Sequence, residues 1–191
     1  ASSASHLVVT RMPRKRPPPT AIWASSTRAT PAPTLMSAVP TLSLRISNVT
    51  GPRLAIGPIP TFYKRLKEGK ACFCSDTARD FIDMSDFLSF MDMAIDEAAP
   101  VGAYNVASGE SHTIKEIYEL VCSHLGKDAS GVPIQPPAAD DVPVMALDAG
   151  ATTRDFGWKA KIAFKDIIHR QLAWYDAHGV SDVFSHLKPK N

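Results

Sequence analysis

Seven prolines fall within the first 40 residues, and they confine a folded domain to the rest of the chain. Each proline fixes φ and removes a backbone N–H donor, so neither a helix nor a central strand can run through residues 13–19 or 31–40. Only residues 6–10 are predicted to form a short strand. We therefore expect residues 1–40 to be a disordered, Pro/Ser/Ala-rich tail and residues 41–191 to form the folded region.

The tail is also purely basic, because no Asp or Glu occurs before Glu68. Basic arms can bind nucleic acid, but Trp23 is the one aromatic residue interleaved here, so nucleic acid is not expected as a partner. A transit peptide is disfavoured because the prolines interrupt the amphipathic helix that such peptides use. Two interpretations stay open. The segment is either a genuine tail or the product of a GC-rich gene translated in the wrong frame, which fits its lack of Gly, Tyr and acidic residues.

From Thr41 onward the pattern changes to that of an α/β domain. Residues 41–46 alternate apolar and polar, as a half-buried strand does, and lead to a Gly51-Pro52 turn. Further short strands are predicted at residues 71–74, 81–82, 103–107 and 144–147. Helices are predicted at residues 59–67, after Ser85 as N-cap, from a Thr113/Glu116 capping box to Leu125, and at residues 162–178.

The cysteines and hydropathy limit the class of protein. Cys72, Cys74 and Cys122 leave at least one thiol unpaired, which favours a reducing, cytoplasmic compartment. Cys72-x-Cys74 lacks the second ligand pair that a structural zinc site needs, so no metal is predicted. Apolar runs stay well short of the roughly 18 residues of a membrane span, so no membrane is expected as a partner.

Four segments follow one another in a recognisable order. They are the strand at 42–49 with Asn48 at its exit, Arg79-Asp80-Phe81-Ile82-Asp83, Tyr104-Asn105-Val106, and Phe156-Gly157-Trp158 before the last helix. This order resembles the C-terminal, substrate-binding half of the extended short-chain dehydrogenase/reductases that epimerise or dehydrate nucleotide sugars. The resemblance covers Thr41 to about Leu187. It implies the last strand of a Rossmann-type sheet followed by a small α/β substrate lobe.

The residues that carry the family's chemistry are not found. Intact members bind NAD(P) on a glycine-rich turn and carry a Tyr-x-x-x-Lys pair on a helix just before the strand matched by residues 42–49. The first glycine here is Gly51, and residues 1–40 contain no Tyr. Tyr63 and Lys67 have the right spacing but follow that strand, so we interpret Tyr63 as a core residue. No catalytic, cofactor-binding or metal-binding residue is therefore predicted.

The resemblance does imply substrate-binding residues, each with a structural alternative. Arg79 would clamp the nucleotide diphosphate with its planar fork, or else form a surface salt bridge to Asp76 or Asp83. Asn48 would bind the substrate's phosphate or sugar, or else its own loop backbone.

Three further residues complete the predicted substrate site. Asn105 would approach the nucleotide, or else stabilise a strand-end turn. Phe73 would wall the nucleobase pocket, or else belong to the core. Asp141 matches the family's Asp, but the Arg expected a few residues before it is absent, which leaves the second diphosphate contact open. Asp86 is interpreted as a structural residue at a helix start.

The predicted function follows from this pattern. We expect an NAD-dependent epimerase/dehydratase family protein that acts on nucleoside-diphosphate sugars for surface polysaccharide synthesis, present as an incomplete chain that is inactive alone. The intact family implies NAD(P) as cofactor and a possible homodimer. The alternative is a non-catalytic nucleotide-sugar-binding or interaction module with a basic tail. If most of the sheet is absent, the edge of strand 42–49 should be exposed.

Overall fold

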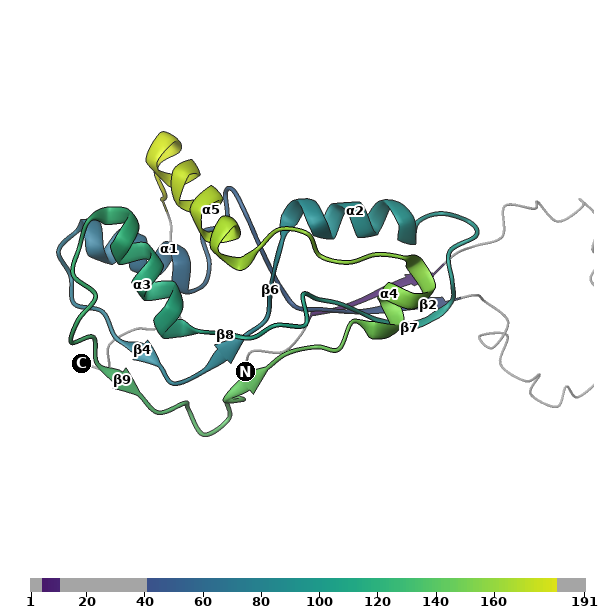
Figure 1. Ribbon diagram of the computed structural model, residues 1–191, viewed down its shortest axis with the longest axis horizontal. Helices are drawn as coiled ribbons and strands as arrows, with labels where there is room; N and C mark the ends of the chain where they lie inside the picture. Colours follow the sequence, from purple (N-terminus) through teal and green to yellow (C-terminus); the bar gives the residue numbers. More distant parts are fainter. Residues whose placement is uncertain (1–4, 11–40, 182–191) are drawn as a thin grey trace, which may run out of the picture.

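The computed structural model describes residues 5–10 and 41–181, which form a three-stranded sheet and an adjoining helical lobe (Figure 1). In chain order the elements are β1 (Ser5–Thr10), β2 (Thr41–Ile46), β3 (Asn48–Thr50), α1 (Pro58–Lys67), β4 (Cys74–Ser75), β5 (Ala78–Arg79), β6 (Phe81–Asp83), α2 (Met84–Ala94), β7 (Gly102–Val106), β8 (His112–Thr113), α3 (Ile114–Leu125), β9 (Ile134–Gln135), β10 (Val144–Met145), α4 (Gly150–Phe156) and α5 (Phe164–His178). The predicted α/β class is confirmed.

Strand β2 lies at the centre of one of two three-stranded sheets, with the order β1-β2-β7, while the other, β10-β5-β8, belongs to the lobe. This central strand runs parallel to β7 and antiparallel to β1, with Leu44 opposite both Tyr104 and Leu7. The strand predicted at residues 6–10 is therefore confirmed. The edge of β2 that we expected to be exposed is paired with β1, so that expectation was wrong. The rest of the predicted tail lies outside the described residues.

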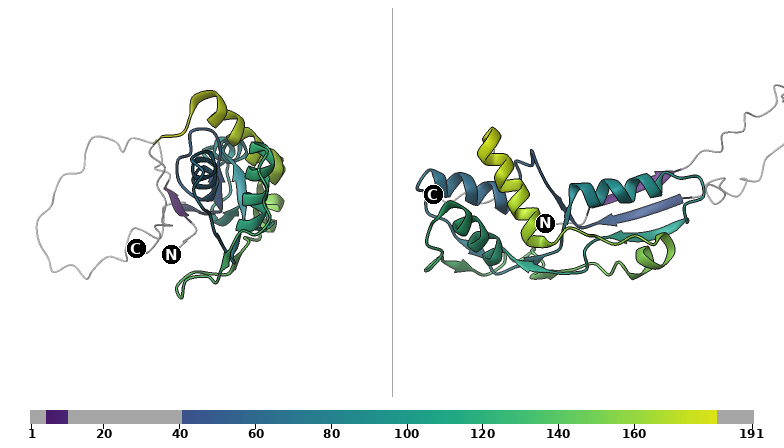
Figure 2. Two further views of the ribbon diagram at one scale, coloured as in Figure 1. Left: turned by 90° about the vertical axis from the view of Figure 1, so that its left-hand side faces the viewer. Right: turned by 45° about the horizontal axis from the view of Figure 1, so that its top comes forward.

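One face of this sheet is buried against α2 and the end of α4. Alternate residues of β2, namely Leu42, Leu44 and Ile46, point into this core as their period-2 pattern predicts. Phe90 from α2 lies at its centre, and its ring packs on those of Phe156 and Trp158 at centroid distances of 5.1 and 5.4 Å. Figure 2 shows α2 and α4 beside the strands.

Helix α2 begins at a different cap from the one predicted. Asp83, in extended conformation at the end of β6, accepts a hydrogen bond from the backbone N–H of Ser85 at 2.7 Å and from the Ser85 hydroxyl. Ser85 thus lies inside the helix and supports the cap instead of forming it. Asp86 is buried, and its Oδ2 accepts the N–H groups of Lys161 and Ile162, both at 2.9 Å. This contact agrees with the structural role predicted for Asp86.

The lobe is built on the apolar faces of α1, α3 and α5. Helix α3 has the predicted capping box of Thr113 and Glu116 and ends at Gly126, whose φ of 64° lies in the left-handed region. The core between the helices contains Ile59, Phe62, Tyr63, Leu66, Cys74, Phe81, Ile114, Ile117, Tyr118, Val121, Cys122, Ile168, Leu172 and Tyr175.

The strands of the lobe are shorter than predicted, since each forms only where it meets a partner. Strand β4 begins at Cys74, not at residue 71, because its pairing with β9 covers Cys74 and Ser75 alone. Strand β10 ends at Met145, where its pairing with β5 stops. Within the described ranges, every helix is too short or too polar to cross a membrane.

Candidate functional site

The candidate site is centred on residues 78–83, where the chain passes from the lobe into the sheet. Strand β5 pairs with β8 and β10 in the lobe, and β6 pairs in parallel with β3 beside the sheet. Asp80 stands between the two strands. This crossing point brings side chains from both parts of the molecule to one place.

Arg79 is buried at this crossing point, with 6% of the residue exposed. Its Nη2 lies 2.5 Å from Oδ1 of Asp141, and its Nη1 donates to the carbonyl oxygens of Ala78 and Pro143 at 2.8 and 3.4 Å. The alternative of a surface salt bridge to Asp76 or Asp83 was therefore wrong. Two of the predicted substrate residues, Arg79 and Asp141, form a largely buried ion pair with each other.

Asp80 is fully buried and holds three loops together. Its Oδ1 accepts the backbone N–H and the hydroxyl of Ser108 at 3.0 and 2.8 Å. Its Oδ2 accepts the N–H of Gly109 at 3.0 Å and that of Leu147 at 3.5 Å. Sequence reasoning missed this residue. Its position directly after Arg79 was the available signal, although its donors lie 28 to 67 residues away.

Asn48 also lies at this point. Its Nδ2 donates to the backbone oxygen of Asp80 at 2.8 Å, and its backbone N–H donates to the same oxygen at 3.1 Å. The structural alternative assumed that the amide binds the backbone of its own loop. It binds the neighbouring segment at Asp80 instead. Through Asp80, Asn48 is held next to Arg79.

Asn105 lies farther along β7, with its side chain turned toward the segment before α4. Its Nδ2 donates to the carbonyl oxygen of Asp148 at 2.7 Å. Its buried Oδ1 has no hydrogen-bond partner in the described part of the chain. This contact ties β7 to the loop before α4, whereas the structural alternative had Asn105 stabilise a turn at the end of β7.

Phe73 is the predicted residue that the structure does not join to this group. It directly precedes β4, is half-buried, and belongs to neither hydrophobic core. The structure therefore groups Asn48, Arg79 and Asp141 around residues 79–80, joins Asn105 to Asp148, and leaves Phe73 apart.

Tyr63 and Lys67 form a pair, but not one suited to proton abstraction. Lys67 Nζ donates to the Tyr63 oxygen at 2.8 Å, and the Tyr63 hydroxyl donates to Oδ1 of Asp176 at 2.6 Å. Burial, followed by this hydrogen bond to Asp176, raises the pKa of the Tyr63 phenol, whereas a catalytic base needs a lowered pKa. Tyr63 is a residue of the lobe core, as predicted.

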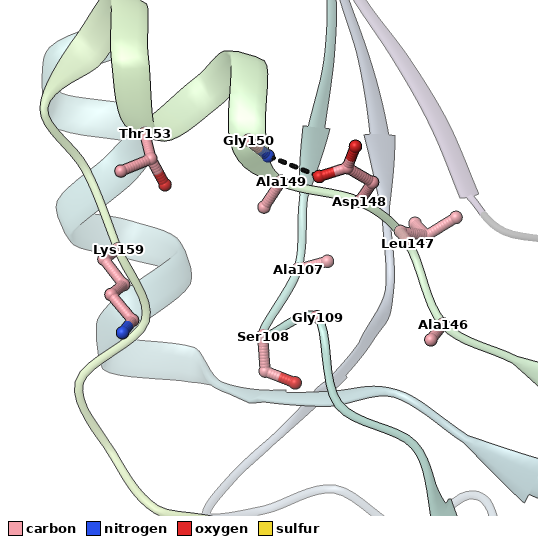
Figure 3. A pocket seen from close by; sticks show the side chains of 10 residues that line it. All are labelled: Ala107, Ser108, Gly109, Ala146, Leu147, Asp148, Ala149, Gly150, Thr153 and Lys159. Carbon is pink, nitrogen blue, oxygen red and sulfur yellow. Dashed lines mark hydrogen bonds between the residues drawn. The ribbon is translucent and has the colours of Figure 1, made fainter.

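A cavity of about 470 Å³ lies next to this group, at the carboxyl end of β7 (Figure 3). It is lined by Ala107, Ser108, Gly109, Ala146, Leu147, Asp148, Ala149, Gly150, Thr153 and Lys159. None of the predicted substrate residues lines it. The N–H groups of Ser108, Gly109 and Leu147 already bind Asp80, so these donors are not free for a ligand.

The described residues do not fit a dinucleotide cofactor. Gly51, which directly follows β3, is packed closely, since a Cβ added to it would lie 3.0 Å from Cβ of Met84. The next helix, α1, has prolines at positions 58 and 60 of its first turn, which remove N–H donors that a pyrophosphate would need. Within residues 5–10 and 41–181, no cluster of His, Cys, Asp or Glu is arranged to hold a metal ion.

Comparison with known proteins places this geometry in a family. Residues 34–171 match the family described as GDP-mannose 4,6 dehydratase. The enzyme WbmG of Bordetella bronchiseptica, solved in complex with NAD and UDP, is 59% identical, with a TM-score of 0.70, over 77% of this chain and 48% of that one. WbmH of the same organism, in complex with NAD+, is 33% identical, with a TM-score of 0.65, over 72% of this chain and 46% of that one.

A curated relative also matches this chain over less than half of the relative's own length. The dTDP-4-dehydro-6-deoxyglucose reductase of Escherichia coli is 26% identical over 138 residues, which are 69% of this chain and 43% of the reductase. The chain thus spans about half the length of the relatives it matches. With more than half of its residues matched by one family, the chain belongs to the GDP-mannose 4,6-dehydratase family of NAD-dependent nucleotide-sugar epimerases and dehydratases, which are extended short-chain dehydrogenase/reductases.

Proposed function

We propose that residues 41–181 form the nucleotide-sugar-binding half of an epimerase/dehydratase of surface polysaccharide synthesis, and that these 191 residues alone bind a nucleoside diphosphate without turning over its sugar. The disposition of Arg79 carries this proposal. Arginine side chains are rarely buried unless their charge is paired. The planar guanidinium of Arg79 is held in one orientation by two backbone carbonyls and by Asp141. A fork oriented in this way suits two phosphate oxygens.

The assigned roles follow from the contacts around Arg79. Arg79 contacts the diphosphate, Asp141 orients its guanidinium, and Asn48, held on the backbone of Asp80, offers its amide to the phosphate or sugar. Asn105 and Phe73 remain predicted substrate contacts. UDP is the first ligand to test because WbmG was solved with it.

The proposed lack of turnover rests on this chain's own residues. Gly51 is closely packed and α1 begins with prolines, so neither can bind a pyrophosphate with backbone N–H groups. The phenol of Tyr63 donates its proton to the carboxylate of Asp176 and is not placed to act as a base. NAD binding and hydride transfer would thus depend on residues outside this chain. The basic-tail module, the cytoplasmic location and the homodimer stay predictions.

Titration calorimetry with UDP on the full 191-residue chain tests the proposal. We expect UDP to bind, and Arg79→Lys to bind it about tenfold more weakly, since a lysine keeps the charge but loses the fork. Arg154→Lys is the matched control, because Arg154 is exposed and paired to its neighbour Asp155. UDP binding that is equal in all three proteins would contradict the role of Arg79. Turnover of a UDP-sugar with added NAD would contradict the lack of catalysis.

A further inference from the structure

The cavity at the carboxyl end of β7 is separate from the proposed diphosphate site and has a rigid inner wall. Its volume of about 470 Å³ lies within the range of about 300–1,000 Å³ that is typical of small-molecule pockets. The inner wall contains Ser108, Gly109 and Leu147, whose backbone N–H groups all donate to the buried carboxylate of Asp80. These groups are therefore fixed in place and do not serve as donors to a ligand.

The neighbouring wall is fixed by contacts between β7 and α4. Asn105 in β7 donates to the carbonyl oxygen of Asp148 at 2.7 Å, and the carbonyl oxygen of Asn105 accepts the hydroxyl of the fully buried Thr152 at 2.6 Å. Asp148 lines the cavity, and its Oδ1 accepts the N–H of Gly150 at 2.8 Å (Figure 3). Because hydrogen bonds from separate segments hold both walls, the cavity is formed before a ligand binds.

Lys159 supplies the positive charge of the cavity. It is the one Lys or Arg among the residues that line it, and it is exposed. Within residues 5–10 and 41–181, its ammonium group forms neither an ion pair nor a hydrogen bond. Thr153 lies on the same side of the cavity (Figure 3), and its hydroxyl also has no hydrogen-bond partner in that part of the chain. The two side chains therefore offer an ammonium group and a hydroxyl donor to a ligand.

The charges around the cavity decide which kind of ligand fits. Negative charge lies on the side away from Lys159, where Asp80 stands behind the inner wall and Asp148 lines the cavity. An anionic group of a ligand is therefore attracted to Lys159 and repelled from the opposite side. On that side Oδ2 of Asp148, which has no hydrogen bond in the described residues, can accept from hydroxyl groups of the ligand. One cation facing two carboxylates favours a single negative charge, as on a carboxylate, over the double charge of a phosphate.

We propose that this cavity binds a sugar acid, a small molecule with one carboxylate and several hydroxyl groups. The carboxylate binds Lys159 and Thr153, and the hydroxyl groups donate to Asp148. The proposed diphosphate site takes no part, since neither Arg79 nor Asp141 lines the cavity. The inference goes beyond the proposed function, and either can fail without the other.

An NMR titration of the isotope-labelled full chain with glucuronate tests the site. We expect glucuronate to shift the amide signals of Gly150 and Thr153 saturably. It should bind at least about tenfold more tightly than glucose, which lacks the charge, or acetate, which lacks the hydroxyl groups. Lys159→Met should weaken glucuronate binding about tenfold, because a hydrogen bond to a charged group is lost. Lys127→Met is the matched control, since Lys127 is exposed just after α3 and does not line the cavity.

A second variant blocks the cavity without changing its charge. Ala149 is a half-buried lining residue, and a leucine at this position would fill part of the space that the ligand needs. Ala149→Leu should therefore weaken glucuronate binding about as much as Lys159→Met does. Melting temperatures are measured for both variants. Lys159 is exposed, so its variant should melt like the unchanged chain and decides the test if Ala149→Leu is destabilised.

Several results would overturn the proposal. They are the absence of saturable shifts, equal affinity for glucose and glucuronate, and equal glucuronate binding by Lys159→Met and Lys127→Met. Displacement of glucuronate by UDP would place the sugar acid in the nucleotide site and would overturn it as well. UDP titrations of the unchanged chain and of Lys159→Met, which should agree, test the proposed function separately.

Discussion

Arg79 and Asp141 form an ion pair in which the arginine side chain is 7% exposed and the carboxylate 25% exposed. The pair joins two predicted substrate residues that lie 62 positions apart in the sequence. This ion pair weakens phosphate binding, because the negative charge of Asp141 offsets the positive charge of Arg79 that would attract a diphosphate. Truncating Arg79 to Ala would also leave Asp141 and the two carbonyls without their donor, so that variant tests stability as well as binding.

A second arginine should strengthen binding at this site. Ala138 is exposed and lies three residues before Asp141, where the family resemblance leads us to expect an arginine. We predict that Ala138→Arg binds UDP about tenfold more tightly, since a hydrogen bond to a charged group contributes about 1.5 kcal/mol or more. Calorimetry measures the change, with Ala173→Arg on the exposed side of α5 as control. An unchanged affinity would place the diphosphate away from residue 138.

Asp80 should be a major determinant of stability. Asp80→Ala removes the acceptor for three buried or half-buried N–H groups and one hydroxyl, so we predict a loss of about 3 kcal/mol in the free energy of unfolding. Urea denaturation measures the loss. Asp92→Ala, an exposed position on α2, should change stability by less than about 0.5 kcal/mol. Similar losses in the two variants would contradict the role given to Asp80.

The contact between α1 and α5 should weaken in acid. The hydrogen bond from Tyr63, and then that from His124, lowers the pKa of Asp176 against the effect of its partial burial. A carboxylate with a lowered pKa stabilises the fold above its unfolded pKa of about 4, and this contribution is lost as the pH falls through the folded value. Urea midpoints of the unchanged chain and of Asp176→Asn should therefore differ at pH 7 and approach each other as the pH falls through the lowered pKa of Asp176. A difference that stays constant with pH would contradict this linkage.

The cysteines should differ sharply in reactivity. Burial raises the pKa of Cys74 to about 11, whereas Cys72 is only half-buried. Since the thiolate is the nucleophile, iodoacetamide at pH 7.5 should alkylate Cys72 first and Cys74 at least about a hundredfold more slowly. Peptide mass spectrometry over time measures both rates. In urea the difference should disappear, and equal rates in the folded protein would contradict the burial of Cys74.

The elements that could be predicted are those whose signals are local. The alternation of Leu42, Leu44 and Ile46 and the Thr113/Glu116 box each lie within one element, so the sequence alone specifies them. The N-cap of α2 was misassigned because Asp83 and Ser85 are both good caps. The extended conformation that β6 imposes on Asp83 decides between them.

Asn48, Arg79 and Asp141 could be named as candidates from the sequence, but their contacts could not be predicted, and Asp80 was missed. The residue types of the candidate site follow from the family resemblance, whereas the pairing of Arg79 with Asp141 and the bonds of Asp80 depend on how three loops converge. Contacts between residues so far apart leave no periodic trace in the sequence. The apolar side of α2 was only partly predictable, since of the residues at 87, 88, 91, 93 and 95 that give the helix its apolar pattern, Leu88, Met93 and Ile95 are exposed and Phe87 and Met91 pack on the core.

Strand β1 has a consequence for assembly. Both edges of β2 are occupied, one by β7 and the other by the six-residue antiparallel ladder with β1. A polypeptide that extended the parallel sheet beyond β2 would have to displace β1 first. Because β1 belongs to the same chain, it competes at a high effective concentration, whatever the concentration of the incoming strand. Growth of the sheet is therefore a strand-exchange reaction, whose rate depends on local opening of the β1–β2 ladder.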